Sequence, residues 1–228
     1  MVTAEMTVWA NLNFHLMNVT DTRNVYSRTD PDRATVDEAL TGNVEAFETL
    51  VLRYQRQIVN YATAMIRDVS DTEDVAQDTF IRAYRALNQF RGDSSFKTWL
   101  YRIATNVART HRDRRGRQSR LDGPGFHNDT QALQARDIPS SEANVEATVI
   151  TRDAIDRALG VLPDELRVAI VLRDVEGLAY KEIAEVTRSP IGTVESRIFR
   201  ARRALRPLLR PLVNAAKKKS IDDDVRTS

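Results

Sequence analysis

Residues 178–206 read LAYKEIAEVTRSPIGTVESRIFRARRALR, and this segment constrains the fold more than any other part of the chain. An amphipathic helix over Ala179 to Val186 is followed by a break of three residues, Thr187 to Ser189. A second helix then begins, with Ser189 as its cap and Pro190 at its first helical position. Two helices joined by so short a break are typical of a helix–turn–helix, which is what we predict here.

The second helix of this pair has two distinct faces. Apolar residues recur at spacings of three and four and form a stripe of Ile191, Val194, Ile198, Ala201 and Leu205. The opposite face carries Ser196, Phe199, Arg200 and Arg203, with Arg197 and Arg202 on its flanks. An arginine-rich face is commonly just a solvated surface, but such a surface would not favour the large apolar Phe199. The pattern therefore predicts a recognition helix that enters a DNA major groove.

Composition excludes several classes of protein. The chain has 228 residues, 42% of them hydrophobic, which is enough for one or two ordinary cores. No run of about 18 apolar residues occurs, so we expect no membrane insertion. The N-terminus lacks the positive segment of a signal peptide, and the absence of cysteine excludes disulfides and cysteine zinc sites. We therefore expect a cytoplasmic protein without a metal or other cofactor.

Charge is distributed unevenly, although the net charge is only +2. Six arginines and one acid lie between Arg109 and Arg120, and six arginines without an acid lie between Arg197 and Arg210. An acidic patch comprises Asp68, Asp71, Glu73, Asp74 and Asp78. The two basic stretches suit two contacts with a polyanion, whereas the acidic patch would repel DNA and suits a protein partner.

Helical periodicity continues through most of the chain, and no segment alternates with period two for long. In the first half it predicts helices over about 34–41, 44–67, 70–90 and 95–113. Ser70 and Glu73 form a capping box, and Ser94 or Ser95 can cap the fourth helix. We predict an all-α fold of two helical domains, 34–113 and 142–213, joined by an extended linker over 114–141. Residues 1–33 are expected to be a loose arm and 214–228 a disordered tail.

The loop near residue 90 and the fourth helix combine aromatic and basic residues. Phe90, Phe96, Trp99 and Tyr101 alternate with Arg91, Lys97, Arg102, Asn106 and Arg109. Phe96 and Trp99 lie on the inner stripe, so core packing is the better interpretation for both. Tyr101, Lys97, Arg102, Asn106 and Arg109 lie on another face. Because aromatic rings stack on unpaired bases and cations follow phosphates, this face favours single-stranded nucleic acid.

Two longer runs resemble a known family. AFETLVLRYQRQIVNYA and DTEDVAQDTFIRAYRALNQFRGDSSFKTWLYRIATNVAR are similar to domain 2 of the extracytoplasmic-function sigma factors of bacterial RNA polymerase. LPDELRVAIVLRDVEGLAYKEIAEVTRSPIGTVESRIFRARRAL resembles their domain 4, and the likeness is greatest to the sigma-E-like branch. The resemblance covers about residues 35 to 212. It implies a promoter-specificity subunit that binds core RNA polymerase and promoter DNA, with an anti-sigma factor as a further partner.

The resemblance also implies roles for individual residues. On the third helix it assigns core-polymerase binding to Asp74, Gln77, Asp78 and Phe80. Ile81 and Arg82 join this set, because they lie on the same mixed acidic and apolar outward face, which suits protein docking. Phe90, Ser94, Ser95 and Asn106 would line a pocket for a flipped base of the melted −10 element. Arg91, Lys97, Tyr101, Arg102 and Arg109 would complete this −10 site along the strand. Ser196, Phe199 and Arg200 would recognise the −35 duplex, with Arg197 and Arg203 on its phosphates.

Two departures and two other functions stay open at this point. Glu195 lies where related sequences often carry a basic residue, which puts the −35 preference in question. Ala179 replaces a frequent serine, which would weaken the helix cap by about 1 kcal/mol. A helix–turn–helix regulator that binds duplex DNA without polymerase is the first alternative. A recombinase or nuclease is the second, but the chain shows no nucleophile or metal cluster for it, and we predict no enzyme.

Overall fold

The computed structural model describes residues 30–66, 71–121 and 154–226, with the backbone alone for 118–121 and 211–226. These ranges contain helices and turns but no strand, which confirms the predicted all-α class. In chain order the elements are α2 (Arg33–Leu40), α3 (Val44–Ile66), α4 (Thr72–Ala86), the 3₁₀ turn η2 (Leu87–Gln89), α5 (Phe96–Leu121), a helix over 154–161, α7 (Asp164–Ile170), the π-helical η3 (Val171–Val175), α8 (Tyr180–Thr187) and α9 (Ile191–Arg226).

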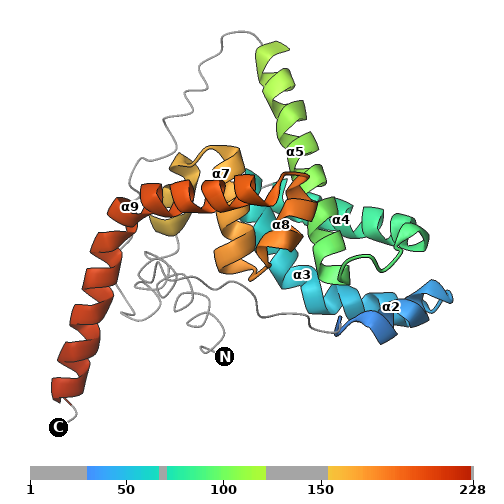
Figure 1. The fold of residues 1–228 in the computed structure, drawn as a ribbon, viewed down its shortest axis with the longest axis horizontal. Coiled ribbons are helices and arrows are strands. Elements are labelled where there is room, and N and C mark those ends of the chain that lie inside the picture. Colours follow the sequence, from blue (N-terminus) through green and yellow to red (C-terminus); the bar gives the residue numbers. More distant parts are fainter. Residues whose placement is uncertain (1–29, 67–70, 122–153, 227–228) are drawn as a thin grey trace.

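Helices α2 to α5 form the first bundle (Figure 1). The predicted apolar stripes face inward, and Leu50, Ile58 and Leu100 are fully buried. Phe96 and Trp99 are also buried, with ring centroids 5.7 Å apart, so their interpretation as core is right. Each such side chain removed from water contributes about 1.5–3 kcal/mol, so the bundle is fixed chiefly by these stripes.

The N-termini of α4 and α5 differ in how they are capped. Ser95 caps α5 as predicted, because its Oγ accepts a hydrogen bond from the Thr98 amide at 3.1 Å. Helix α4 begins only at Thr72, with Asp71 as the N-cap residue and no side-chain cap bond. The predicted capping residue Ser70 lies outside the described residues.

Two helices continue further than the sequence pattern predicts. Helix α5 runs to Leu121 rather than ending near Asp113, so residues 114–121 of the expected linker are helical. Arginine is a good helix former, and Arg115 on this extension bonds Asp71 at 2.5 Å. Helix α9 runs to Arg226, so the tail over 214–226 is helical where we expected disorder. Figure 1 shows α9 bending along its length, and prolines 207 and 211 account for such a bend.

The helix–turn–helix forms where it was predicted. Helices α8 and α9 are joined by a turn in which Arg188 adopts a left-handed conformation with φ of 51°. The first bonds of α9 run from the Thr193 and Val194 amides to the Pro190 carbonyl, so α9 begins at Ile191, one residue later than predicted. Ser189 does not act as the predicted cap: its Oγ donates to the Thr187 carbonyl at 3.3 Å.

The apolar stripe of α9 is confirmed except at its first residue. Val194, Ile198, Ala201 and Leu205 are at most 1% exposed, whereas Ile191, the first residue of α9, is 47% exposed. At the start of α8, Ala179 provides no side-chain cap. The Glu182 carboxylate accepts a hydrogen bond from the Ala179 amide at 2.7 Å. Of the two bonds of a capping box, only this one from the glutamate is present.

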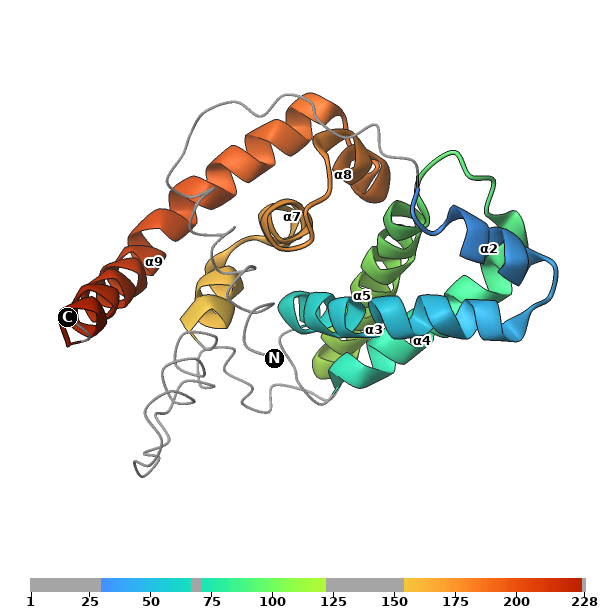
Figure 2. The same cartoon turned by 90° about the horizontal axis from the view of Figure 1, so that it is seen from below.

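The two halves of the chain contact one another. In Figure 2 the bundle of α2 to α5 lies on one side, and α8 and α9 arch over α7 on the other. Helix α8 packs against α5, and α7 contacts α3. Helix α5 is therefore both the last helix of the bundle and the support for the helix–turn–helix half, which we define as residues 154–226.

Candidate DNA-binding and partner-binding surfaces

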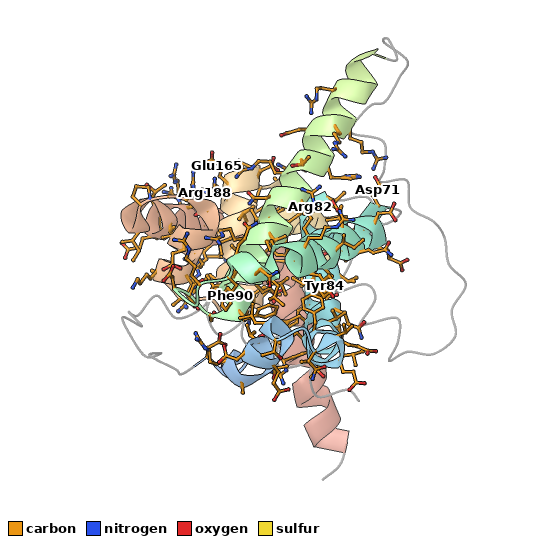
Figure 3. The ribbon with its side chains drawn as sticks, turned by 90° about the vertical axis from the view of Figure 1, so that its right-hand side faces the viewer. Asp71, Arg82, Tyr84, Phe90, Glu165 and Arg188 are labelled. Carbon is orange, nitrogen blue, oxygen red and sulfur yellow. The ribbon has the colours of Figure 1, made fainter. Side chains whose placement is uncertain are left out.

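The predicted docking residues of α4 share one accessible face. Asp74, Gln77, Ile81 and Arg82 are exposed, and Asp78 and Phe80 are half-buried. Arg82 pairs with Asp78 one turn away at 2.8 Å, which keeps acid and base on the same face. Tyr84 is 52% exposed and extends this face, although the sequence pattern did not single it out. Figure 3 shows Arg82 and Tyr84 on the side of α5 opposite to Glu165 and Arg188 of the helix–turn–helix half.

The predicted −10 residues divide into exposed and covered groups. Arg91, Asn106 and Arg109 are exposed, while Ser94, Ser95, Lys97 and Arg102 are half-buried. Phe90 is only 9% exposed, because its ring packs on Trp99 with centroids 5.3 Å apart. Phe90 therefore lies at the edge of the aromatic core rather than in an open pocket.

Tyr101 is not on the open face where the sequence pattern placed it. Its side chain is fully buried, with its ring against Tyr61 at 5.3 Å and its hydroxyl donating to the Glu176 carboxylate. Lys97 Nζ donates to the Glu176 carbonyl at 2.6 Å. The periodicity of one helix cannot show that Glu176, 75 residues further along the chain, packs over Tyr101.

Two more acids of the helix–turn–helix half bond to α5. Thr98 Oγ1 donates to Glu182 Oε1 at 2.8 Å, and Ser95 Oγ lies 3.4 Å from the same oxygen. Asp164 Oδ2 forms an ion pair with Arg112 Nη2 at 2.6 Å. Glu176, Glu182 and Asp164 thus bond to hydroxyl and cationic groups on α5 and on the residue before it. Three of these groups belong to the predicted −10 residues Ser95, Lys97 and Tyr101. We call these contacts the interdomain contact.

The interdomain contact should respond to pH through Glu176. Burial raises the pKa of this carboxyl, although the Tyr101 hydroxyl and Lys97 act in the opposite direction. Tyr101 stays protonated, because burial also raises its pKa. The pKa of Glu176 is raised where the carboxyl is buried in the closed state and is ordinary where it is exposed. Its contribution to the stability of the closed state is therefore complete at pH below the ordinary pKa, and it is lost as pH rises through the raised pKa. The contact should therefore weaken as pH rises from the ordinary carboxyl range through the raised pKa of Glu176.

Fluorescence energy transfer can measure this response, because the chain has no cysteine that would compete for the dyes. Dyes on Glu48→Cys and Arg206→Cys, both at exposed positions, would report on the separation of the two halves. We expect transfer in wild type to change as pH rises from the ordinary carboxyl range through the raised pKa of Glu176, and to change much less in Glu176→Gln, which stays neutral. The same profile in both proteins would show that Glu176 does not set the response.

The recognition face of α9 is open. Ser196, Arg200 and Arg203 are exposed, and Phe199 is 60% exposed among them. Ser196 Oγ donates to the Gly192 carbonyl at 2.8 Å, and Arg200 Nε donates to the Ser196 carbonyl at 3.3 Å. Both side chains therefore lie along the helix. The Arg200 guanidinium keeps further donors for a ligand, and the Ser196 hydroxyl oxygen keeps its acceptor lone pairs. Glu195 is exposed beside them.

The flanking arginines of α9 have structural partners. Arg197 donates to Ser189 Oγ at 2.7 Å and to Glu165 Oε2 at 2.6 Å. Arg202 makes two bonds to the buried Asp174 carboxylate, at 3.1 and 2.7 Å. Arg188, exposed in the turn, adds a cation that the sequence pattern did not single out.

The described residues contain neither a membrane-spanning helix nor a cluster of metal ligands. Within them, none of the helices combines the length and the apolar character that crossing a bilayer requires. No three side chains of the metal-ligating kinds gather closely enough there to hold an ion.

Comparison with known proteins covers both halves. Sigma-70 region 2 matches residues 50–118, and Sigma-70, region 4 matches residues 152–205. The RNA polymerase sigma-H factor of Pseudomonas aeruginosa is 43% identical over 198 residues, which are 82% of this chain and 98% of that protein. The ECF RNA polymerase sigma-E factor of Escherichia coli is 40% identical over 185 residues, 80% of this chain and 96% of its own.

Solved structures are similar as well. The sigma factor RpoE of Bartonella quintana, in complex with the anti-sigma factor NepR, has a TM-score of 0.60 and 27% identity, covering 73% of this chain and 98% of its own. CnrH in complex with the cytosolic domain of CnrY has a TM-score of 0.58 and 31% identity, covering 80% and 99%. Because regions 2 and 4 match in order and relatives align over most of the length, the chain belongs to the extracytoplasmic-function sigma factors of the sigma-70 family.

Proposed function

We propose that this sigma factor divides promoter recognition between its two halves. As a sigma subunit it binds core RNA polymerase, gives it promoter specificity and directs initiation. The docking surface we propose is the face of α4 formed by Asp74, Gln77, Asp78, Phe80, Ile81 and Arg82. The exposure of Ile81 among charged residues supports this assignment, and so does the position of the face across α5 from the helix–turn–helix half (Figure 3).

The −35 element is assigned to the open face of α9. Ser196, Phe199 and Arg200 would contact base edges, and Arg203 would contact a phosphate. Arg197 is a phosphate candidate only if it exchanges its bond to Glu165, which is itself an exposed residue. The exposure of Phe199 is the observation that carries this assignment, because a purely structural helix would bury such a ring.

The melted −10 strand is assigned to Phe90, Arg91, Ser94, Ser95, Lys97, Tyr101, Arg102, Asn106 and Arg109. Ser95, Lys97 and Tyr101 are bonded to the helix–turn–helix half, so a strand cannot contact all three in the closed arrangement. The function therefore requires that half to move off α5 before the strand binds. The closed arrangement is the state of the free protein.

The remaining assignments follow the family. Sigma factors are promoter-specificity subunits, and we propose that this one has no catalytic activity or cofactor and acts in the cytoplasm. Because the similar RpoE structure holds an anti-sigma factor, a protein of that class is the proposed inhibitor. We keep 34–113 and 142–213 as the two functional domains, with residues 122–153 outside the described part.

Run-off transcription tests this function. Purified core polymerase with this chain should give promoter-dependent transcripts from a genomic promoter library, and core alone should not. Arg200→Ala should lower −35-dependent initiation about tenfold, and Asn106→Ala should change the −10 base preference, since a base contact contributes about 1–3 kcal/mol. Gln55→Ala, at an exposed position of α3, is the control. If both variants behave like the control, these site assignments are wrong.

A further inference from the structure

The segment just before the first bundle helix makes specific contacts with the loop that precedes α5. The segment comprises Asp30, Pro31, Asp32 and Arg33, the end of the predicted loose arm over residues 1–33, and the contacts of Asp30, Asp32 and Arg33 show that this part of the prediction is wrong. The loop comprises residues 91–95 and carries three of the proposed −10 residues, Arg91, Ser94 and Ser95. Whatever fixes this loop also fixes where those side chains meet a base.

Asp30 bonds directly to the start of α5. Its Oδ2 accepts a hydrogen bond from the amide of Phe96, the first residue of that helix, at 2.8 Å. Its Oδ1 accepts a hydrogen bond from the Asp32 amide at 3.1 Å. The first amides of a helix have no partner within the helix, and a carboxylate there is also favoured by the helix dipole. Asp30 and Ser95 thus cap α5 together, one from 66 residues away and one locally.

Asp32 and Arg33 also fix the position of this segment. Asp32 is fully buried and accepts hydrogen bonds from Arg53 and the Tyr54 hydroxyl of α3. The side chain of Arg33 bonds Asp37 at 3.1 Å and lies against Gly92 in the loop. A Cβ at Gly92 would overlap Arg33 Nη1, and Gly92 has a φ of +74°. The loop backbone at Gly92 therefore lies directly against the Arg33 side chain, in a conformation that favours glycine.

We propose that residues 30–33 form a brace that sets the position of the −10 loop, with Asp30 and Arg33 as positioning residues for −10 base selectivity. The inference rests on the proposed −10 role of the loop. Neither residue touches DNA in this scheme. Removing Asp30 leaves the Phe96 amide without its acceptor and frees the loop from the rigid part of the bundle, while α9 and its −35 face stay unchanged.

The test uses the full chain with core polymerase on two template libraries, one with every base at each −10 position and one with the −35 element varied. Asp30→Ala should reduce the preference between the best and second-best −10 bases about fivefold, which corresponds to the loss of one cap. Arg33→Ala, at a side chain that is largely exposed, should act in the same direction without risk to folding. Glu38→Ala, an exposed acid of α2, is the control.

A second measurement separates positioning from general damage. Hydrogen exchange at the Phe96 amide should be at least tenfold faster in Asp30→Ala than in Glu38→Ala, while exchange in α9 is the same in both. An unchanged −10 preference in Asp30→Ala and Arg33→Ala would overturn the brace. So would a parallel loss of −10 and −35 preference. A wild-type protein without any −10 preference would instead overturn the proposed function.

Discussion

Glu176→Ala should raise the affinity of the free protein for single-stranded −10 DNA about tenfold. The variant removes the carboxylate that accepts the Tyr101 hydroxyl, so the closed arrangement would hold a buried hydroxyl without its partner. Such a group costs about 1–3 kcal/mol, and that cost disfavours the closed state alone. Because Lys97 and Tyr101 become available to the strand only in the open state, the apparent affinity rises with the open population.

Fluorescence anisotropy would measure this affinity, with a labelled oligonucleotide that carries the −10 element found in the run-off library. Glu185→Ala is the matched control, since it removes an exposed acid from α8, in the same half of the chain as Glu176. A short bismaleimide between Thr98→Cys and Glu182→Cys should have the opposite effect and abolish strand binding, because it holds the two halves together. If Glu176→Ala opens the dye-labelled protein without any gain in affinity, the covered face of α5 is not the strand-binding face.

The fold was largely predictable from local pattern. Stripes at spacings of three and four identified the helices and the buried Phe96 and Trp99, because an amphipathic helix buries its apolar face wherever the neighbouring elements lie. The ends of α5 and α9 were not predictable in this way. Charged, low-complexity segments resemble linkers and tails in composition, although arginine, lysine and alanine are also good helix formers.

The exposure of the site residues was predictable only where it depends on their position around their own helix. The open faces of α4 and α9 follow from periodicity, whereas the burial of Tyr101 and the role of Asp30 depend on contacts 75 and 66 residues away. Glu176 lies just after η3 in a segment without any pattern that marks it. The resemblance to a family implies which residues would face DNA in a promoter complex, but it does not show which of them are covered in the closed arrangement.

The arginines of α9 illustrate the same limit. Arg200 and Arg202 are two residues apart, and the helical pattern separates them only as the face and the flank of one arginine-rich surface. In the structure, Arg200 is exposed on the recognition face, whereas Arg202 makes two bonds to Asp174, whose side chain is fully buried. One arginine is therefore available for DNA, and the other neutralises a buried carboxylate that joins α9 to η3.

Arg202→Ala should destabilise the helix–turn–helix half by about 3 kcal/mol, because removing one partner leaves a buried charge without compensation. For a chain of this size that corresponds to a fall in Tm on the order of 10 °C, which circular dichroism can follow. Arg200→Ala should leave Tm unchanged and lower only −35-dependent initiation. Replacing both partners, Arg202→Met with Asp174→Leu, should restore most of the lost stability, since an apolar pair of similar volume needs no counter-charge. Equal thermal stability of the two single variants would mean that the Arg202–Asp174 pair does not stabilise the helix–turn–helix half.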